Sequence, residues 1–352
     1  MDSVTQAVLG AGIAGAMMGA RYGRKALLAG AALATLPDLD ILIDYGDPLS
    51  QMINHRGFSH SLFVLTGFSI FLAWLARRFR LLGSEPVYGR LLLTIWLILI
   101  THTLLDAFTS YGTQIWWPLQ PPPASWSSVF IIDPFYTLPL LIGVLVALFV
   151  GLRPGVVRAL LYLLLLGGAY LLLSLGAKQW AEHRVHTMLA EQGHRPVAMF
   201  SVPQPFNIVL WRVVARLDDG NYIEAVTGML DQRPPEFIAF PSNATLGAAL
   251  QPREAIDGLR WFTDDWLRYD DIAGQLVVSD LRMGIGTGHY SFRFVVGEQD
   301  PDTKQWKAVT PRYWEGGPAR RDMAALSATL KRAWRTGTPL PLAMWDRHMT
   351  QP

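Results

Sequence analysis

Charged side chains are scarce in the first half of this chain, and this unevenness constrains its fold more than any other feature. Residues 1–177 hold 10 Lys and Arg and 8 Asp and Glu, so 18 of 177 positions are charged. Residues 178–352 hold the remaining 20 and 20, so 40 of 175 positions are charged. Because a soluble domain carries about a quarter charged residues, we predict a transmembrane helical domain over 1–177 and a soluble domain over 178–352.

Composition also excludes several classes of protein. The chain has no cysteine, which excludes a scaffold stapled by disulfides. Its net charge of +2 is too small to indicate a nucleic-acid partner. A signal peptide is not expected at the start, because the only early charge is Asp2 and a positive leader is missing.

Six apolar stretches in the first half predict a membrane α-helical bundle of about six segments. Crossing a bilayer core takes about 20 residues, and the second stretch is short enough to indicate a tilted or re-entrant helix. The first two stretches are rich in Gly and Ala, which suits close helix packing. The stretches are Val4–Ala20, Ala26–Leu36, Phe63–Ala76, Leu91–Phe108, Phe135–Leu152 and Val156–Ala177.

The loops between these segments alternate in basic residues. Cytoplasmic loops collect Lys and Arg, and alternate loops here hold nine of them against one. The nine are Arg21, Arg24, Lys25, Arg77, Arg78, Arg80, Arg90, Arg153 and Arg158, and the one in the other loops is Arg56. We therefore expect both termini, and the domain over 178–352, to lie outside the cytoplasm.

Acids and histidines gather at the opposite, outer end. Ionisable groups at membrane depth are costly and indicate a functional site. Of the eight acids in this half, only Glu85 falls in a predicted cytoplasmic loop. The outer groups are Asp2, Asp38, Asp40, Asp44, Asp47, His55, His60, His102, Asp106 and Asp133.

The first motif within this group is Leu36-Pro37-Asp38-Leu39-Asp40. Pro37 disfavours helix at the residue before it. In an extended segment Asp38 and Asp40 project to the same side, which offers two carboxylates to a cation. A solvated turn or a helix N-terminus is the alternative interpretation.

The second motif runs from His55 to Ser61 and contains two histidines and Arg56. Ser59 is a predicted N-cap for the apolar helix that follows, with His60 in its first turn. That helix start and the Arg56 guanidinium would stabilise an anion. Contacts between these side chains and lipid headgroups are the alternative.

The third motif is His102-Thr103-Leu104-Leu105-Asp106. Spacing of i and i+4 puts His102 and Asp106 on one helix face, which suits a shared metal or a His–Asp pair. A buried structural hydrogen bond is the alternative for this motif alone. Three such motifs at one depth favour a metal site over these separate alternatives.

The ligand types predict which metal binds. Imidazole and carboxylate without thiolate favour zinc, manganese or iron, and the number of candidates allows two or more ions. The predicted metal ligands are Asp38, Asp40, His55, His60, His102 and Asp106, and the predicted catalytic residues are Arg56, Ser59 and Asp40. Water activated by a divalent metal, most simply zinc, would then hydrolyse an ester or phosphoester.

These motifs together resemble the YdjM family of bacterial inner-membrane proteins. The resemblance rests on Met1-Asp2-Ser3-Val4-Thr5, Pro37-Asp38-Leu39-Asp40, the His55–Ser61 motif and the His102–Asp106 motif, and it covers roughly residues 1–175. It implies a multi-pass inner-membrane protein and a metal-dependent hydrolase, distantly similar to zinc-dependent phospholipase C. Many members have His after the early Thr, where this chain has Gln6, so one ligand of the family pattern is lost.

The second half predicts a soluble α+β domain. Asn207–Leu217, Asn221–Leu230, Leu276–Leu281 and Tyr290–Val296 are rich in β-branched and aromatic residues, and Arg320–Arg335 is typical of a helix. We expect this domain to cover or gate the membrane site.

The leading hypothesis is an integral membrane metal-dependent hydrolase that acts on a lipid or lipid-linked substrate at the outer face. Two other classes remain open. The first is an ion or solute transporter, which predicts polar residues deep in several spans and on both faces. The second is a non-catalytic membrane assembly protein, which predicts that Asp40→Ala and His102→Ala leave function intact.

Overall fold

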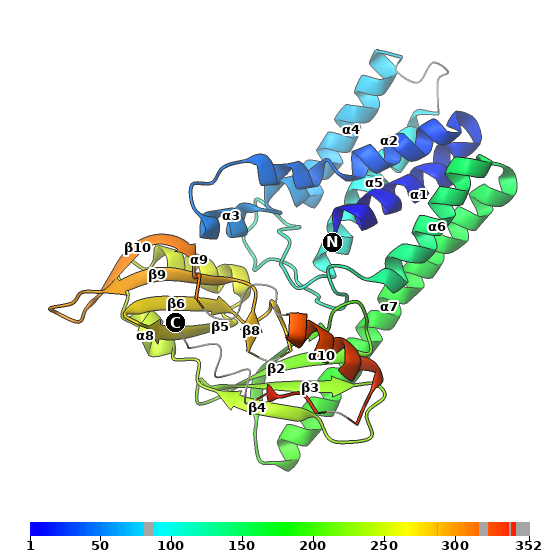
Figure 1. Cartoon of the computed structure of the whole chain (residues 1–352). Helices are drawn as coiled ribbons and strands as arrows, with labels where there is room; N and C mark the ends of the chain where they lie inside the picture. The colour runs from blue at the N-terminus through cyan, green and yellow to red at the C-terminus, as the bar shows by residue number, and fades with distance from the viewer. Residues whose placement is uncertain (81–86, 287, 317–322, 338, 343–352) are drawn as a thin grey trace. The chain divides into compact units, whose positions relative to one another are not determined.

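The computed structural model describes residues 1–80, 87–286, 288–316, 323–337 and 339–342. They form two compact units (Figure 1). The N-terminal unit comprises residues 1–43, 55–126 and 131–173, and the C-terminal unit comprises 44–54, 127–130 and 174–352. The main boundary lies within one helix, α7 (Pro154–Glu191), and two short segments of the first half, 44–54 and 127–130, group with the C-terminal unit.

The N-terminal unit is built from helices at all six predicted apolar stretches. They are α1 (Ser3–Tyr22), α2 (Arg24–Ala34), α4 (Leu62–Arg78), α5 (Tyr88–Ala107), α6 (Pro134–Val150) and the first part of α7. Acidic and hydroxyl side chains begin three of them: Asp2 accepts from the amides of Val4 and Thr5, Asp133 caps α6, and Ser61 caps α4. The predicted cap of α4 at Ser59 is therefore wrong, because a short 3-10 turn, η2 (Phe58–His60), precedes the helix and moves its start to Ser61.

Membrane-spanning length is reached by fewer helices than predicted. Among the described residues, α1, α5 and α7 are each long and apolar enough to cross a bilayer. A fourth span arises if α4 is joined to the segment from Pro48 to His60, from which it is bent by 49°. At a rise of about 1.5 Å per residue, the 11 residues of α2 cover only about 16 Å, far less than a bilayer core. The six-span bundle is thus not confirmed.

Two glycines let α1 and α2 pack closely as an antiparallel hairpin. A Cβ atom on Gly10 would collide with the backbone carbonyl of Gly30, and a Cβ on Gly30 would collide with that of Gly10. Such small residues allow helix backbones to approach. This contact fixes α2 against α1 and so places the segment that follows α2, η1 (Pro37–Leu42), beside the start of α1.

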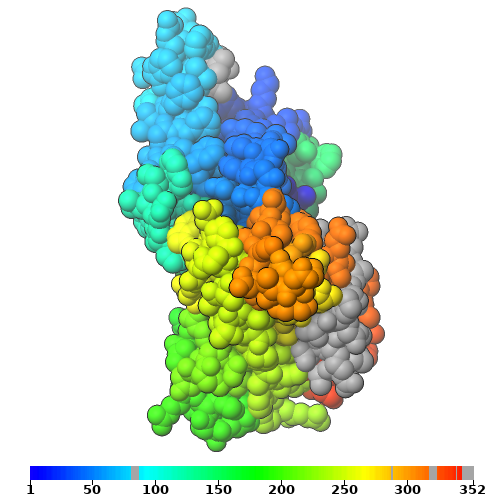
Figure 2. Space-filling model, turned by 90° about the vertical axis from the view of Figure 1, so that its left-hand side faces the viewer, coloured from blue at the N-terminus to red at the C-terminus, as the bar shows by residue number. Residues whose placement is uncertain are grey.

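The outer surface of this unit is apolar. Along α4, which is light blue in Figures 1 and 2, Phe63, Ile70, Phe71 and Trp74 are exposed. An exposed apolar surface of this extent marks a membrane or protein interface, and on an apolar helix it is the surface that lipid would contact.

The C-terminal unit contains two antiparallel four-stranded sheets, in agreement with the predicted mixture of strands and helices. One sheet has the order β1-β2-β3-β4 and the other β10-β9-β6-β5. The first sheet consists of β1 (Pro196–Pro203), β2 (Leu210–Leu217), β3 (Tyr222–Gly228) and β4 (Glu236–Phe240). The second consists of β5 (Leu267–Ile272), β6 (Gln275–Asp280), β9 (Arg293–Gln299) and β10 (Trp306–Tyr313). A small hairpin, β7 (Gly284–Ile285) with β8 (His289–Tyr290), and the helices α3 (Pro48–Asn54), α8 (Ala244–Ala248), α9 (Glu254–Thr263) and α10 (Met323–Trp334) complete it.

The core of this unit joins residues of both sheets. Phe200 and Val214 of the first sheet pack in one buried cluster with Trp266 and Leu281, which flank strands of the second. The single strand predicted over Tyr290–Val296 is instead split between β8 and β9. The predicted helix over Arg320–Arg335 begins at Met323 in the described residues, and Arg320 lies outside them.

Candidate metal centre

Four side chains of the N-terminal unit converge on one point. Asp38 comes from η1, His60 from η2, and His102 and Asp106 from the C-terminal end of α5. Each offers one ligand atom, and the four atoms all lie within 4.8 Å of one another. His60, His102 and Asp106 are fully buried, whereas Asp38 keeps 22% of its side chain exposed. The cluster is therefore a buried pocket of ligands with one side open at Asp38.

The distances between these atoms match the edges of a tetrahedron around a metal ion. His60 Nε2 lies 3.2 Å from His102 Nε2 and 3.1 Å from Asp106 Oδ2. Asp38 Oδ1 lies 3.5 Å from each imidazole Nε2, and His102 Nε2 lies 3.6 Å from Asp106 Oδ2. Ligands about 2.0–2.2 Å from a zinc ion, at tetrahedral angles, are about 3.3–3.6 Å apart. Five of the six distances among these atoms are thus 3.1–3.6 Å, and all six are within 4.8 Å, a spacing close to that of ligands around one metal ion.

Local structure explains why these residues meet. His102 and Asp106 are one turn apart on α5, so they share the face predicted from their spacing. Asp38 and Asp40 do not share a side, because Pro37–Leu42 is a 3-10 helix rather than the extended segment we expected. In a 3-10 helix each residue turns by about 120°, so residues two apart diverge. Asp38 consequently joins the cluster and Asp40 does not.

Asp40 instead holds the loop that carries His60. Its Oδ1 lies 2.8 Å from His55 Nδ1, and its Oδ2 accepts from the Arg56 amide at 2.8 Å and from the Ser59 hydroxyl at 2.6 Å. Burial raises the pKa of Asp40, but the hydrogen bonds from His55 and Ser59 outweigh it and leave the pKa below its ordinary value. Asp40 is therefore a carboxylate at neutral pH and can only accept hydrogen bonds.

This arrangement sets the tautomer of His60. The single Ser59 proton is donated to Asp40, so the Ser59 oxygen must accept from His60 Nδ1, 2.9 Å away. His60 then carries its proton on Nδ1, and its Nε2 lone pair faces the cluster. Hydrogen bonds from the far side of an imidazole commonly orient metal-binding histidines in this way. Asp40 and Ser59 thus position His60, and neither enters the ligand set.

Basic and amide groups surround both carboxylate oxygens of Asp106. Gln6 donates its side-chain amide to Asp106 Oδ1 at 3.1 Å and to the His102 carbonyl at 3.2 Å. The Met1 amine also contacts Asp106 Oδ1. Arg56 Nε lies 3.3 Å from Asp106 Oδ2. These groups leave Oδ2 directed at the cluster.

Arg56 is buried beside the cluster rather than aimed at an open anion site. It is 4% exposed, its Nη1 lies 3.4 Å from Thr109 Oγ1, and its guanidinium lies 5.1 Å from the centre of the Tyr111 ring. A buried positive charge beside a carboxylate stabilises its ionised form. Arg56 consequently balances the negative charge of Asp106.

The remaining carboxylate, Asp38, is also poised to bind a cation. Burial raises its pKa, but the neighbouring His102 and His60 imidazoles outweigh this effect and hold the pKa well below the usual range.

Of the six predicted ligands, the structure brings four together, and Asp40 and His55 pair with each other. The sequence reasoning did not foresee the contacts of Gln6, Thr109 and Tyr111. Thr109 could have been found, since it lies three residues after Asp106, and its hydroxyl donates to the Asp106 carbonyl at 2.7 Å. At position 6 the family pattern has a histidine, so Gln6 indicated only the loss of a ligand. The hydrogen bond that Gln6 donates to Asp106 depends on how α1 packs on α5.

Comparisons with known proteins bear on the same part of the chain. Residues 1–181, just over half of the chain, match the family described as YdjM inner membrane protein. The chain belongs to this family. The YdjM match contains all four clustered residues, and together with the apolar helices it supports an inner-membrane location.

Two relatives extend this picture. The uncharacterized protein YfhP of Bacillus subtilis is 26% identical over 63% of this chain and 67% of its own length. The inner membrane protein YbcI of Escherichia coli is 33% identical over 26% of this chain and 52% of its own length. The match to YbcI therefore spans about half of that protein. No solved structure matches the chain.

Proposed function

We propose that this YdjM-family protein is a metal-dependent hydrolase. The observation that carries the proposal is the set of four ligand atoms within 4.8 Å of one another, partly open at Asp38. Catalytic zinc sites keep a position for water or substrate, so with four protein ligands present a catalytic role would need a fifth position or the release of one ligand. Because Asp38 is the one partly exposed ligand, we infer that water and substrate approach from its side.

The donor set favours zinc. Two imidazoles and two carboxylates suit zinc and related transition metals, whereas calcium and magnesium prefer oxygen ligands alone. The geometry accounts for one ion, since His55 and Asp40, which we had predicted as further ligands, hydrogen-bond to each other. A divalent ion in this place supplies Lewis acidity, which makes water nucleophilic near neutral pH and polarises an ester or phosphoester oxygen.

The protein side chains around the site have positioning and electrostatic roles in this proposal. Asp40 and Ser59 hold His60 with its Nε2 lone pair forward. Arg56 offsets the charge of Asp106, so two carboxylates can lie close together without strong repulsion. In the hydrolysis, water adds to the phosphorus or acyl carbon, the bond to the leaving alkoxide breaks, and the alkoxide takes up a proton.

A lipid or lipid-linked substrate at the outer face is supported by the surroundings. Phe58 and Phe63 flank the His60 turn, and each lies near an exposed tryptophan, Trp117 and Trp116 respectively. Such aromatic belts lie at the level of lipid headgroups, where the hydrolysable bonds of lipids also lie. The alternation of basic loops supports an outward orientation for this end, with the C-terminal unit extracytoplasmic and the chain crossing the membrane several times.

The experiment is elemental analysis of the full chain purified in detergent without chelators, followed by hydrolysis assays on phosphoester and lipid substrates. We expect about one zinc per wild-type chain, and little zinc and no metal-dependent hydrolysis in His60→Ala. His186→Ala, a substitution at an exposed histidine outside the cluster, is the matched control and should retain both. Wild-type protein free of transition metals, after zinc has been supplied, would refute the proposal.

A further inference from the structure

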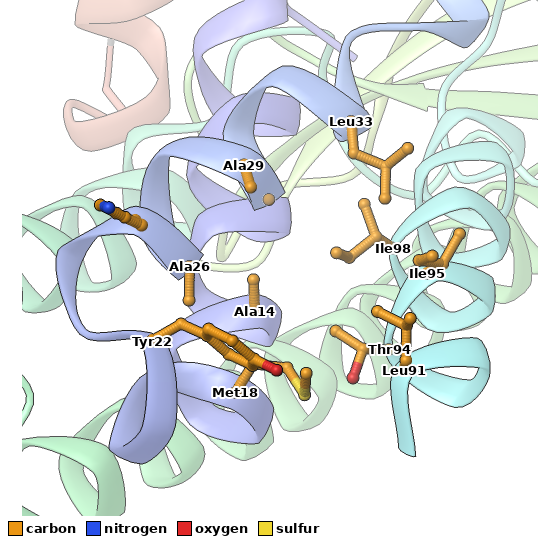
Figure 3. A pocket seen from close by; sticks show the side chains of 12 residues that line it. Ala14, Met18, Tyr22, Ala26, Ala29, Leu33, Leu91, Thr94, Ile95 and Ile98 are labelled. Atoms are coloured by element: carbon orange, nitrogen blue, oxygen red, sulfur yellow. The ribbon is translucent and has the colours of Figure 1, made fainter. Parts of the chain in front are cut away.

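An apolar groove runs between α2 and α5 on the membrane part of the N-terminal unit, with α1 as its floor. Its volume is about 440 Å³. Figure 3 shows Leu33 of α2 facing Ile95 and Ile98 of α5 across the opening, with Met18 and Tyr22 of α1 at one end. The lining also includes Ala14, Lys25, Ala26, Ala29, Gly30, Leu91 and Thr94.

The lining is suited to hydrocarbon rather than to a polar solute. The hydroxyl of Thr94 is already donated to the Arg90 carbonyl at 2.7 Å, so it does not demand a ligand. From Lys25 to Leu33 the groove follows α2 for eight residue steps, or about 12 Å at 1.5 Å per residue. This length lies within one leaflet of a bilayer core about 30 Å thick.

One end of the groove is positively charged. Lys25 lines it directly, and Arg21 and Arg24 lie within four residues, at the end of α1 and the start of α2. Arg24 donates to the carbonyls of Leu148 and Phe149, which fixes it at that helix end. Basic pockets between membrane helices bind anionic lipid headgroups, so the charge at this end selects a negatively charged occupant.

The other end of the groove approaches the metal centre. Ile98 precedes His102 by one turn on the same face of α5, and Leu33 lies five residues before Asp38. An occupant would therefore fill the space between α5, which supplies His102 and Asp106, and α2, which leads into the turn that carries Asp38. A hydrocarbon chain bound in this groove would support the packing of α2, which is too short to span the bilayer alone.

We propose that this groove binds one acyl chain of an anionic phospholipid, with the phosphate at Lys25. The phosphate end of the site lies at the C-terminal end of α1, away from the metal centre, and its occupant is a bound lipid, distinct from a hydrolysed substrate. The proposal does not depend on hydrolase activity, and the inactive variant His60→Ala should bind the lipid as the wild type does.

The test measures thermal unfolding of the full chain in detergent with added phosphatidylglycerol or phosphatidylcholine. We expect phosphatidylglycerol to raise the Tm by on the order of 5 °C at a concentration about a hundred times its Kd, and phosphatidylcholine to do much less. Lys25→Gln should weaken phosphatidylglycerol binding about five-fold, the effect of one surface charge. Arg78→Gln, at the end of α4 and outside the lining, is the charge control and should bind normally.

The hydrocarbon part of the site is tested by filling it. Ala29→Trp places an indole in the groove and should lower the affinity at least about ten-fold, the loss expected from excluding roughly two methylene groups. Ala32→Trp, at an exposed position of α2 outside the lining, is the matched control. A phosphatidylglycerol with a photoreactive acyl chain should label α2 and α5 of the wild type, which tests the site even if Ala29→Trp misfolds.

Three results would overturn the proposal. One is equal stabilisation by the two lipids, and another is photolabelling spread over the other helices without enrichment at the groove. The third is stabilisation that depends on protein concentration and not on lipid, which would mean that a second copy of the chain occupies the groove.

Discussion

Replacing Asp40 tests whether a residue that touches no metal ligand atom directly still controls the metal centre. Asp40 accepts hydrogen bonds from His55, the Arg56 amide and Ser59 at 2.8, 2.8 and 2.6 Å. Removing all three in Asp40→Ala frees the Ser59 hydroxyl to donate to His60 Nδ1. The proton of His60 then moves to Nε2, the atom that faces the cluster, and this tautomer cannot bind a metal.

Asp40→Asn is expected to be milder, because asparagine keeps one acceptor oxygen. With that oxygen toward Arg56 and Ser59, its amide nitrogen faces His55 Nδ1, which can accept a hydrogen bond as a neutral imidazole. Substitution of the groups that orient metal ligands costs about 10–100-fold in metal affinity. We expect Asp40→Asn to lose about ten-fold and Asp40→Ala about a hundred-fold, which is about 1.4 and 2.7 kcal/mol.

The assay is competition for zinc between the purified full chain and a chromophoric chelator, with circular dichroism as the check on folding. Asp44→Asn, which alters an exposed acid near η1, is the control and should leave the zinc affinity unchanged. Wild-type zinc affinity in a folded Asp40→Ala protein would refute the role of Asp40 in setting the His60 tautomer. A greater loss in Asp40→Asn than in Asp40→Ala would refute the tautomer argument specifically.

Three further outcomes follow from contacts described above or from the C-terminal core. Arg212 and Glu224 form a fully buried ion pair with a 3.0 Å Nε–Oε2 bond. Arg212→Met should therefore lower the free energy of unfolding by about 3–5 kcal/mol, measured from the denaturant midpoint. A change below about 1 kcal/mol would contradict this. Gly30→Leu should separate α2 from α1 and lower both the Tm and zinc binding. Gly46→Leu is the control, because Gly46 has a positive φ but open space around it; it should leave zinc binding intact. Removal of zinc by chelation should lower the Tm of the wild type and leave that of His60→Ala unchanged; equal shifts in both proteins would argue against a specific site.

The sequence predicted the parts of the fold that depend on local periodicity. Apolar stretches marked the helices, and the spacing of His102 and Asp106 placed them on one helix face, where the structure has them. The family resemblance is confirmed by the match over residues 1–181. These features need only the regular geometry of a helix or a motif read in order along the chain.

The remaining features depend on irregular backbone and on tertiary contacts. Asp38 and Asp40 were predicted to act together, but a 3-10 turn after Pro37 directs only Asp38 to the cluster. Serine is a preferred helix N-cap, and we predicted that role for Ser59. Its hydroxyl instead joins Asp40 to His60, because η2 delays the start of α4 to Ser61. The contact of Gln6 with Asp106 requires α1 to pack on α5, and no local pattern encodes that contact.

The four clustered residues come from η1, η2 and α5, which are far apart in the chain. During synthesis Asp38 and His60 emerge well before His102, so a nascent chain that lacks α5 presents two ligands and cannot hold an ion tightly. If the proposed ion binds, its uptake is therefore a late event in biogenesis, after α5 has been synthesised. The bound ion would then cross-link η1, η2 and α5 and oppose their separation.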